Sequence, residues 1–408
     1  MSVAPVTVRP PVSAPVSSAS QALAVARDYA ASLASGVIER DRAGTVPWAD
    51  LAALDASGLL GITVPATHGG PDLSPVVLAE VVRTIAAVDP AIAQVPQGHF
   101  LFVDVLATMG SAAQQQRLFA DVLAGARLGN GLAERGGQHA QDLKTRLYRT
   151  PGGLRLDGRK YYCTGAISAR WIGVSALDEA GRLVLVLIAR DATGVQVDEE
   201  WNVMGQRATV SGSAVFEDVR VDPELVLPYQ DAFARPQQLG ARAQLIHAAI
   251  QVGIAGGALQ DARAFVRTRA RPFFEAVRAG WADTAAADPH TIHRFGEMAT
   301  RVAAAEALLA SAAATLEEVG RQPADAAAAA RGSIAVAQAK AFGSQTASSV
   351  ASDVFALTGA SAADERHDLS RHWRNARTHA SHDPVDWKYY HVGNYLLSEV
   401  PPPNHGQL

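Results

Sequence analysis

Cysteine is almost absent from this 408-residue chain: Cys163 is the only one, so no internal disulfide can form. A single free thiol is typical of proteins in a reducing compartment, and we expect a cytoplasmic protein. An excess of one charge is lacking too, because 36 Lys and Arg against 40 Asp and Glu give a net charge of −4. That balance excludes the basic surface expected of a nucleic-acid-binding protein.

Long hydrophobic runs are also missing. The most apolar stretch, LIHAAIQVGIAGGAL at 245–259, is too short and too polar to span a bilayer, so we expect no membrane insertion. The first twenty residues lack the basic start and the continuous apolar segment of a signal peptide. Their Pro and Ser content predicts a disordered tail over residues 1–19.

Two enzyme motifs do not occur. No Gly-x-Gly-x-x-Gly follows a strand-like run, so the protein is not expected to reduce a flavin by itself. The His-Glu-x-x-His of zinc proteases is absent as well, although three histidines gather in RTHASHDPVDWKYYH at 377–391. We therefore expect no metal in that stretch.

The pair Asp383-Pro384 predicts a helix break inside the same stretch, because proline disfavours the α conformation of the preceding residue. We expect Asp383 to be the N-cap, and Pro384 the first residue, of the following helix. The break would hold His382 at the junction, facing a cavity. A purely structural turn is the alternative.

Residue patterns predict an α+β fold with segregated elements. Apolar residues at helical spacing predict an N-terminal helical domain over 20–127. Short β-branched and aromatic runs between Gly and Asp turns predict a central antiparallel β-domain over 128–236. Alanine-rich periodicity over 237–408 predicts a C-terminal four-helix bundle. Its few charges favour packing against other subunits, with a monomer as the alternative.

Several segments resemble the acyl-CoA dehydrogenase superfamily in their order and spacing, which gives the fold an acyl-CoA dehydrogenase-like architecture. They are LDGRKYYCTGAISARWIGVSAL, MGQRATVSGSAVFEDVRVDPELVL and ARAQLIHAAIQVGIAGGALQDARAFVRTRARPF. A narrower resemblance, to the flavin-dependent monooxygenases of sulfur acquisition, of the dibenzothiophene monooxygenase type, lies in four stretches. These are LGNGLAER (128–135), YYCTGA (161–166), RTRARPF (267–273) and WRNARTHASHDPVDWKYYHVGNYLL (373–397).

Two departures from the dehydrogenase pattern favour FMN over FAD as the cofactor. The stretch 373–397 replaces an Ile-Tyr-Glu-Gly-Thr-like motif, which in many dehydrogenases carries the catalytic glutamate. The Gly-Gly-x-Gly-Tyr near the FAD diphosphate reads Thr-Gly-Ala-Ser-Ala at 358–362. Related monooxygenases place an FMN-contacting arginine near the position of Ser361, which this chain lacks.

The resemblance implies three catalytic residues, His99, Thr164 and His382. Thr164 would lie near flavin N5, and with His382 would stabilise and protonate a C4a-hydroperoxyflavin, while His99 helps to position the substrate. A hydroxyl both donates and accepts hydrogen bonds, which suits a proton network. The alternatives are a turn threonine that bonds its own backbone, and a histidine that is only part of the core.

The resemblance also implies the remaining cofactor contacts. Asn130 would meet the pyrimidine edge of the flavin, since an amide donates and accepts at once, and Trp201 would lie beside the ring. The flavin phosphate would be bound by the hydroxyl and guanidinium groups of three residues, which are Ser211, Ser213 and Arg271. His382 and Asp383 complete the set. The alternatives are a surface loop at Asn130, packing at Trp201 and a solvated helix end at Arg271.

The implied function is that of a homotetrameric FMNH₂-dependent monooxygenase acting on a small sulfide, sulfoxide or sulfone. It would need O₂ and a separate NAD(P)H:flavin reductase. One rival is an FAD-dependent acyl-CoA dehydrogenase-type oxidoreductase, for which Glu134 and Glu297 are the candidate bases. The other is a helical assembly protein without catalysis.

Overall fold

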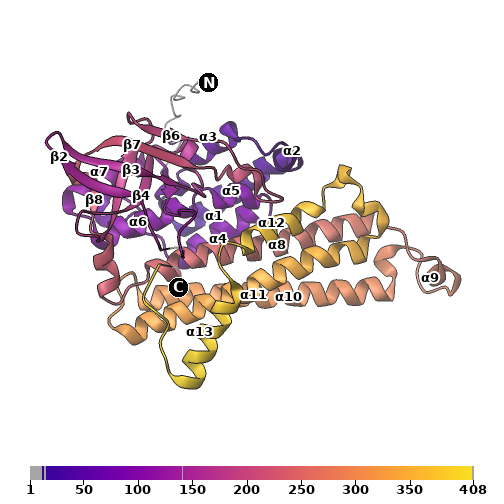
Figure 1. Cartoon of the computed structure of the whole chain (residues 1–408). Coiled ribbons are helices and arrows are strands. Elements are labelled where there is room, and N and C mark those ends of the chain that lie inside the picture. Colours follow the sequence, from indigo (N-terminus) through magenta and orange to yellow (C-terminus); the bar gives the residue numbers. More distant parts are fainter. Residues whose placement is uncertain (1–11, 13–14, 140, 407–408) are drawn as a thin grey trace.

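The computed structural model describes residue 12 and residues 15–139 and 141–406, so most of the predicted disordered tail lies outside the described residues. Along the chain, helices come first, then a sheet, then helices again (Figure 1), which confirms the α+β fold class. Within these described ranges, we find no helix that is both long and apolar enough to cross a membrane.

The N-terminal block consists of short helices that begin at recognisable signals. Ser111 and Gln114 form a reciprocal capping box, and Asp89 caps the helix that starts with Pro90. The helices are α1 (Ala19–Leu33), α2 (Val37–Ala43), α3 (Trp48–Ala56), α4 (Pro75–Ala86), α5 (Pro90–Gln94), α6 (Gln97–Met109) and α7 (Ala112–Leu123).

The middle of the chain forms an eight-stranded sheet in the order β6-β7-β3-β2-β4-β5-β8, with β1 also paired to β4. The strands are β1 (Leu128–Gly131), β2 (Arg146–Thr150), β3 (Gly153–Lys160), β4 (Trp171–Leu177), β5 (Leu183–Ala189), β6 (Val195–Val197), β7 (Ala214–Val221) and β8 (Val226–Leu227). Most pairs are antiparallel as predicted, but β1 and the start of β2 run parallel to β4. Composition did not predict this, because β1 reads LGNG and has no β-branched residue.

Three long helices, α8, α10 and α11, form the body of the C-terminal domain (Figure 1). The helices are α8 (Leu239–Thr268), α9 (Phe274–Arg278), α10 (Pro289–Val319), α11 (Ala326–Thr358), α12 (Ser370–Ala380) and α13 (Val385–Ser398). The predicted helix break is confirmed, since α12 ends at Ala380 and α13 begins at Val385.

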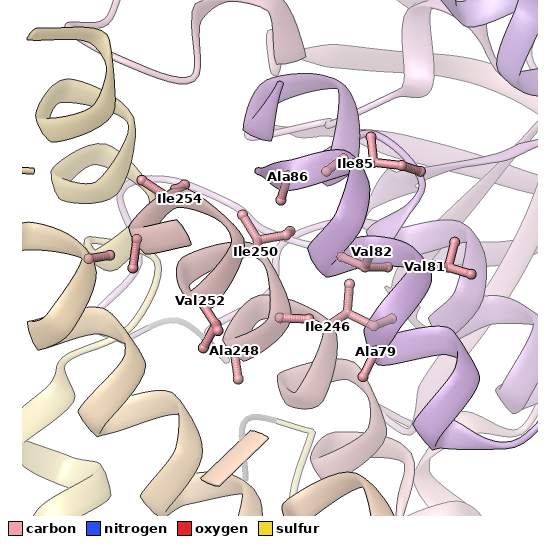
Figure 2. Close-up of a cluster of buried hydrophobic side chains, with 14 of the residues drawn as sticks. Ala79, Val81, Val82, Ile85, Ala86, Ile246, Ala248, Ile250, Val252 and Ile254 are labelled. Atoms are coloured by element: carbon pink, nitrogen blue, oxygen red, sulfur yellow. The ribbon is translucent and has the colours of Figure 1, made fainter. Parts of the chain in front are cut away.

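The main core joins the two helical blocks. Figure 2 shows Val82 and Ala86 of α4 facing aliphatic side chains of α8, including Ile246 and Ile250, and all four side chains are buried. At Gly257 an added Cβ would lie 2.1 Å from the Ala87 carbonyl oxygen, so the two backbones nearly touch there. This close packing fixes α8, and everything that packs on it, relative to the N-terminal domain.

Candidate functional site

Three buried hydroxyls form a continuous chain where the turn after β3 meets the loop before β7. Thr164 Oγ1 lies 2.6 Å from Ser211 Oγ, and Ser211 Oγ lies 2.8 Å from Thr209 Oγ1. Thr209 Oγ1 donates to the Gln206 carbonyl oxygen at 2.9 Å. The structure thus brings together two predicted site residues, Thr164 and Ser211, and adds Thr209, which the sequence did not single out.

The turn that carries this chain is held in an unusual conformation. Gln206 and Val210 have positive φ angles of 54° and 41°, which non-glycine residues seldom adopt. Trp201 Nε1 donates to the Gln206 carbonyl oxygen at 2.9 Å, and the Gln206 backbone N–H donates to Asn375 Oδ1 of α12 at 2.5 Å. Trp201 therefore supports the turn, and α12 anchors it.

Asn130 lies beside Thr164. Its backbone N–H donates to the Thr164 carbonyl oxygen at 3.0 Å. Its side-chain Oδ1 accepts the Leu132 N–H at 3.0 Å, so the carboxamide has a fixed orientation with its NH₂ group as the remaining donor. Strand β1 thus positions the Asn130 carboxamide next to the hydroxyl chain.

His99 is fully buried in α6, and both of its ring nitrogens bond to the backbone. Nε2 lies 2.9 Å from the Leu60 carbonyl oxygen, and Nδ1 lies 3.2 Å from the Leu128 backbone nitrogen. A carbonyl accepts and an N–H donates, so Nε2 carries the hydrogen and the ring is neutral. Burial lowers the pKa of His99 to about 4. The imidazole has no nitrogen left for a substrate and instead fixes the start of β1, two residues before Asn130.

His382 occupies the corner between α12 and α13, with its side chain 41% exposed. Its Nδ1 lies 3.0 Å from Asp383 Oδ1, and its ring lies on His247 of α8, with 4.1 Å between ring centroids. Burial alone would raise the pKa of Asp383. The hydrogen bond from His382 and the charges of Lys340 and Lys388 nevertheless hold this pKa far below its usual range. The carboxylate therefore keeps the hydrogen on Nδ1 and leaves Nε2 available.

Asp383 does not cap α13, and that prediction was wrong. Pro384 occupies the N-cap position, where the structure shows no side-chain cap. The Asp383 carboxylate instead pairs with Lys340 of α11 and with Lys388 of α13, whose Nζ lies 2.9 Å away. An ionised carboxylate between two buried ammonium groups gains more from these charges than from one capping bond.

Asp383 lines two cavities. The larger, of about 740 Å³, lies between α11 and the α12–α13 corner and includes Ser344 and Arg377 in its lining. The smaller, of about 320 Å³, is lined by Trp387, Lys388 and other residues of α13 and the C-terminal segment. In the part of the chain that the structure describes, no group of three or more His, Cys, Asp or Glu side chains is arranged to hold a metal ion.

Within one subunit, the three residues predicted to bind the flavin phosphate do not form a common site. Ser213 donates to Asp198 Oδ2 at 2.7 Å, and Ser211 belongs to the hydroxyl chain, so both hydroxyls already have protein partners. Arg271 is exposed in the segment between α8 and α9. Figure 1 shows α9 at the end of the bundle away from the sheet.

Sequence reasoning missed His247, Lys340 and Asn375, which hold the predicted residues in place. His247 and Lys340 are isolated polar residues inside alanine-rich helices, and Asn375 lies within the polar stretch of α12. A histidine or lysine on the buried face of such a helix needs a polar partner, and this requirement could have marked both residues in the sequence. The identity of the partner depends on how α8, α11 and α12 pack.

Comparison with known families covers most of the chain. Residues 19–126 match the family model of the acyl-CoA dehydrogenase N-terminal domain, and residues 131–219 match that of its middle domain. Residues 245–387 match an acyl-CoA dehydrogenase C-terminal domain model. The three matches follow the same order as the two helical blocks and the sheet.

Individual relatives are similar over nearly their whole length. Dibenzothiophene monooxygenase of Rhodococcus erythropolis is 33% identical over 396 residues, covering 92% of this chain and 93% of the relative. A probable FMNH2-dependent monooxygenase, SfnC of Pseudomonas putida, is 34% identical, with 93% and 96% covered. The crystal structure of FMN-bound TdsC from Paenibacillus sp. A11-2 superposes with a TM-score of 0.90 at 31% identity, covering 95% of this chain and all of that one.

Proposed function

Because the chain belongs to the acyl-CoA dehydrogenase family, we propose that it is a two-component flavin-dependent monooxygenase that uses reduced FMN and O₂ to oxygenate a small organosulfur compound. The single observation that carries this proposal is the full-length similarity to dibenzothiophene monooxygenase and to the probable FMNH2-dependent monooxygenase SfnC. The substrate class is a sulfide, sulfoxide or sulfone. A separate NAD(P)H:flavin reductase supplies the reduced FMN.

The residues around the hydroxyl chain fit a flavin. The Asn130 amide and the Thr164 hydroxyl lie side by side, joined by a backbone hydrogen bond, and offer polar groups to the edge of a planar ring. Reduced FMN, when bound, supplies two electrons to O₂, so that one oxygen atom goes to the organosulfur substrate and the other leaves as water. The protein supplies orientation and proton control.

His382 is the residue that we assign to proton control. Its Nδ1 hydrogen is held by Asp383, so Nε2 accepts a hydrogen bond or, when protonated, returns a proton at the same atom. Lys340 and Lys388 keep Asp383 ionised and thereby fix this tautomer. The exposed ring edge allows the group to reach a bound reactant.

Neither carboxylate considered for an acyl-CoA dehydrogenase reaction is available as a base. Glu134 Oε1 accepts hydrogen bonds from Lys160 Nζ and from the backbone N–H and the hydroxyl of Thr145, and Oε2 accepts one from the Lys144 backbone N–H. Burial would raise the pKa of Glu134, but these hydrogen bonds outweigh burial and lower it. Glu297 is exposed on α10, which belongs to the C-terminal bundle. The geometry therefore favours oxygenation over dehydrogenation.

The test is turnover with the complete system. Purified protein, FMN, NADH, a flavin reductase and O₂ should convert at least one member of a panel of sulfides, sulfoxides and sulfones to a product with one more oxygen atom. Omitting the reductase should abolish the reaction. Failure to bind FMN at micromolar concentration would instead support the non-catalytic assembly protein.

Replacing His382 tests its role in oxygen transfer separately from flavin binding in the same assay. His382→Ala should consume NADH at a similar rate but release hydrogen peroxide in place of oxygenated product, because proton control is lost. Ser381→Ala, at the exposed neighbouring position, is the matched control and should form product like the wild type. If His382→Ala gives as much product per NADH as the wild type, His382 has no part in the reaction.

A further inference from the structure

The hydroxyl chain has only one possible direction. The Gln206 carbonyl oxygen can only accept, so the single hydroxyl hydrogen of Thr209 points at Gln206. The contact between Ser211 and Thr209 must then use the Ser211 hydrogen. The contact between Thr164 and Ser211 must in turn use the Thr164 hydrogen. Thr164 therefore presents only lone pairs to any further partner.

The end of the chain is fixed, so this direction cannot easily reverse. The Gln206 carbonyl oxygen accepts from Trp201 Nε1, from the Thr209 hydroxyl and, at a longer 3.3 Å, from the Thr209 backbone N–H, so it is fully occupied as an acceptor. The Gln206 N–H is held by Asn375 of α12. Next to it, a Cβ at Gly205 would lie 2.1 Å from the Arg374 carbonyl oxygen, so the turn lies directly on the α12 backbone. Ser211 and Thr209, the inner two hydroxyl residues, are only 3% and 2% exposed, so water has little access to compete as a donor there.

We propose that this chain makes Thr164 a dedicated hydrogen-bond acceptor and so selects reduced FMN, whose N5 carries a hydrogen, over oxidised FMN, whose N5 can only accept. The inference rests on the proposed function, in which flavin N5 lies at Thr164. Oxidised FMN would place two acceptors against each other in a buried site, whereas reduced FMN completes the chain as its first donor.

Thr209 and Ser211 are accordingly positioning residues that act through Thr164. An enzyme that takes its reduced flavin from a separate reductase must bind that form in the presence of oxidised flavin. A directed hydroxyl chain provides this discrimination without a charged group near the ring. It also gives Ser211 a role at N5 in place of the phosphate contact predicted from the sequence.

The test compares the affinities of the two flavin forms. Dissociation constants for FMNH₂ under anaerobic conditions and for oxidised FMN are measured for the wild type, Thr209→Val, Ser211→Ala and Thr209→Ser. The wild type should bind FMNH₂ at least tenfold more tightly than FMN. Thr209→Val and Ser211→Ala free a hydroxyl hydrogen for N5, so this preference should fall about tenfold. That loss corresponds to a midpoint potential of bound FMN about 30 mV lower.

Thr209→Ser is the matched control, because it keeps the hydroxyl and should retain the wild-type preference. The inference is wrong if the wild type shows no preference, or if Thr209→Val and Ser211→Ala both keep it. These outcomes leave the proposed monooxygenase intact as long as FMN binds. If neither form of FMN binds to the wild type, it is the proposed function that fails.

Discussion

Three imidazole rings lie together between α8 and the end of α12, those of His247, His379 and His382. His247 Nδ1 lies 3.0 Å from His379 Nε2, and the His247 ring also contacts that of His382. Burial, and then the positive charge of neighbouring groups including Lys340, lowers the pKa of both His247 and His379 well below the usual value. Folding therefore keeps these rings neutral, whereas in the unfolded chain they take up protons near pH 6.5.

This arrangement predicts a loss of stability in acid. Histidines with a lowered folded-state pKa destabilise the protein as the pH falls below about 6.5, by up to about 1.4 kcal/mol per pH unit for each ring. His247→Phe removes one of them, so the free energy of unfolding should fall less steeply between pH 7.5 and pH 5.5. Urea denaturation at these two pH values measures it. An unchanged pH dependence in the variant would show that His247 takes up protons as readily in the folded protein as in the unfolded chain.

At the scale of elements, the turn at 204–211 and helix α12 form one unit. Gly205 lies against the α12 backbone, and Asn375 of α12 accepts the Gln206 N–H. The sequence predicted the helices and strands on either side, because periodic apolar patterns are local. It did not predict this turn, because Gln206 and Val210 are not typical residues for positive φ. The anchoring Asn375 lies 169 residues further along the chain.

A methyl group at the contact should separate the two elements. Gly205→Ala is expected to lower the free energy of unfolding by about 1–3 kcal/mol, because the Arg374 carbonyl oxygen belongs to a helix backbone that cannot easily move. It should also weaken FMN binding, since the hydroxyl chain ends at the carbonyl oxygen of the next residue, Gln206. The control is Gly256→Ala inside α8, where an added Cβ meets no atom within 4 Å. Equal stability of the two variants would contradict this account of the turn.

At the scale of the whole molecule, large apolar side chains remain exposed at one end of the bundle and along α13. They are Phe273, Phe274, Trp281, Trp387, Leu396 and Leu397. Leu397 is 89% exposed, an unusual environment for leucine in a monomer. Alanine-rich composition predicted that the bundle needs partners, but it did not locate the surfaces, because exposure depends on the folded chain. Arg271 lies two residues before the first of these side chains.

We therefore expect a homotetramer in which Arg271 of one subunit reaches the flavin site of another. Light scattering should give four times the chain mass of 42.8 kDa, about 171 kDa. Trp281→Glu should reduce the assembled fraction, because it buries a charge at the interface, and should weaken FMN binding with it. A wild-type protein that is monomeric at micromolar concentration would contradict this arrangement and leave Arg271 without a flavin to bind.

In the proposed reaction, the protein inserts one atom of O₂ into a sulfur compound. The most direct measurement is mass spectrometry of the product formed under ¹⁸O₂ with the reductase, FMN and NADH present. One labelled oxygen atom per turnover should appear in the product, and no label should appear when ¹⁸O is supplied as water instead. Product that carries oxygen only from water, or flavin oxidation without any labelled product across the substrate panel, would contradict the proposed reaction.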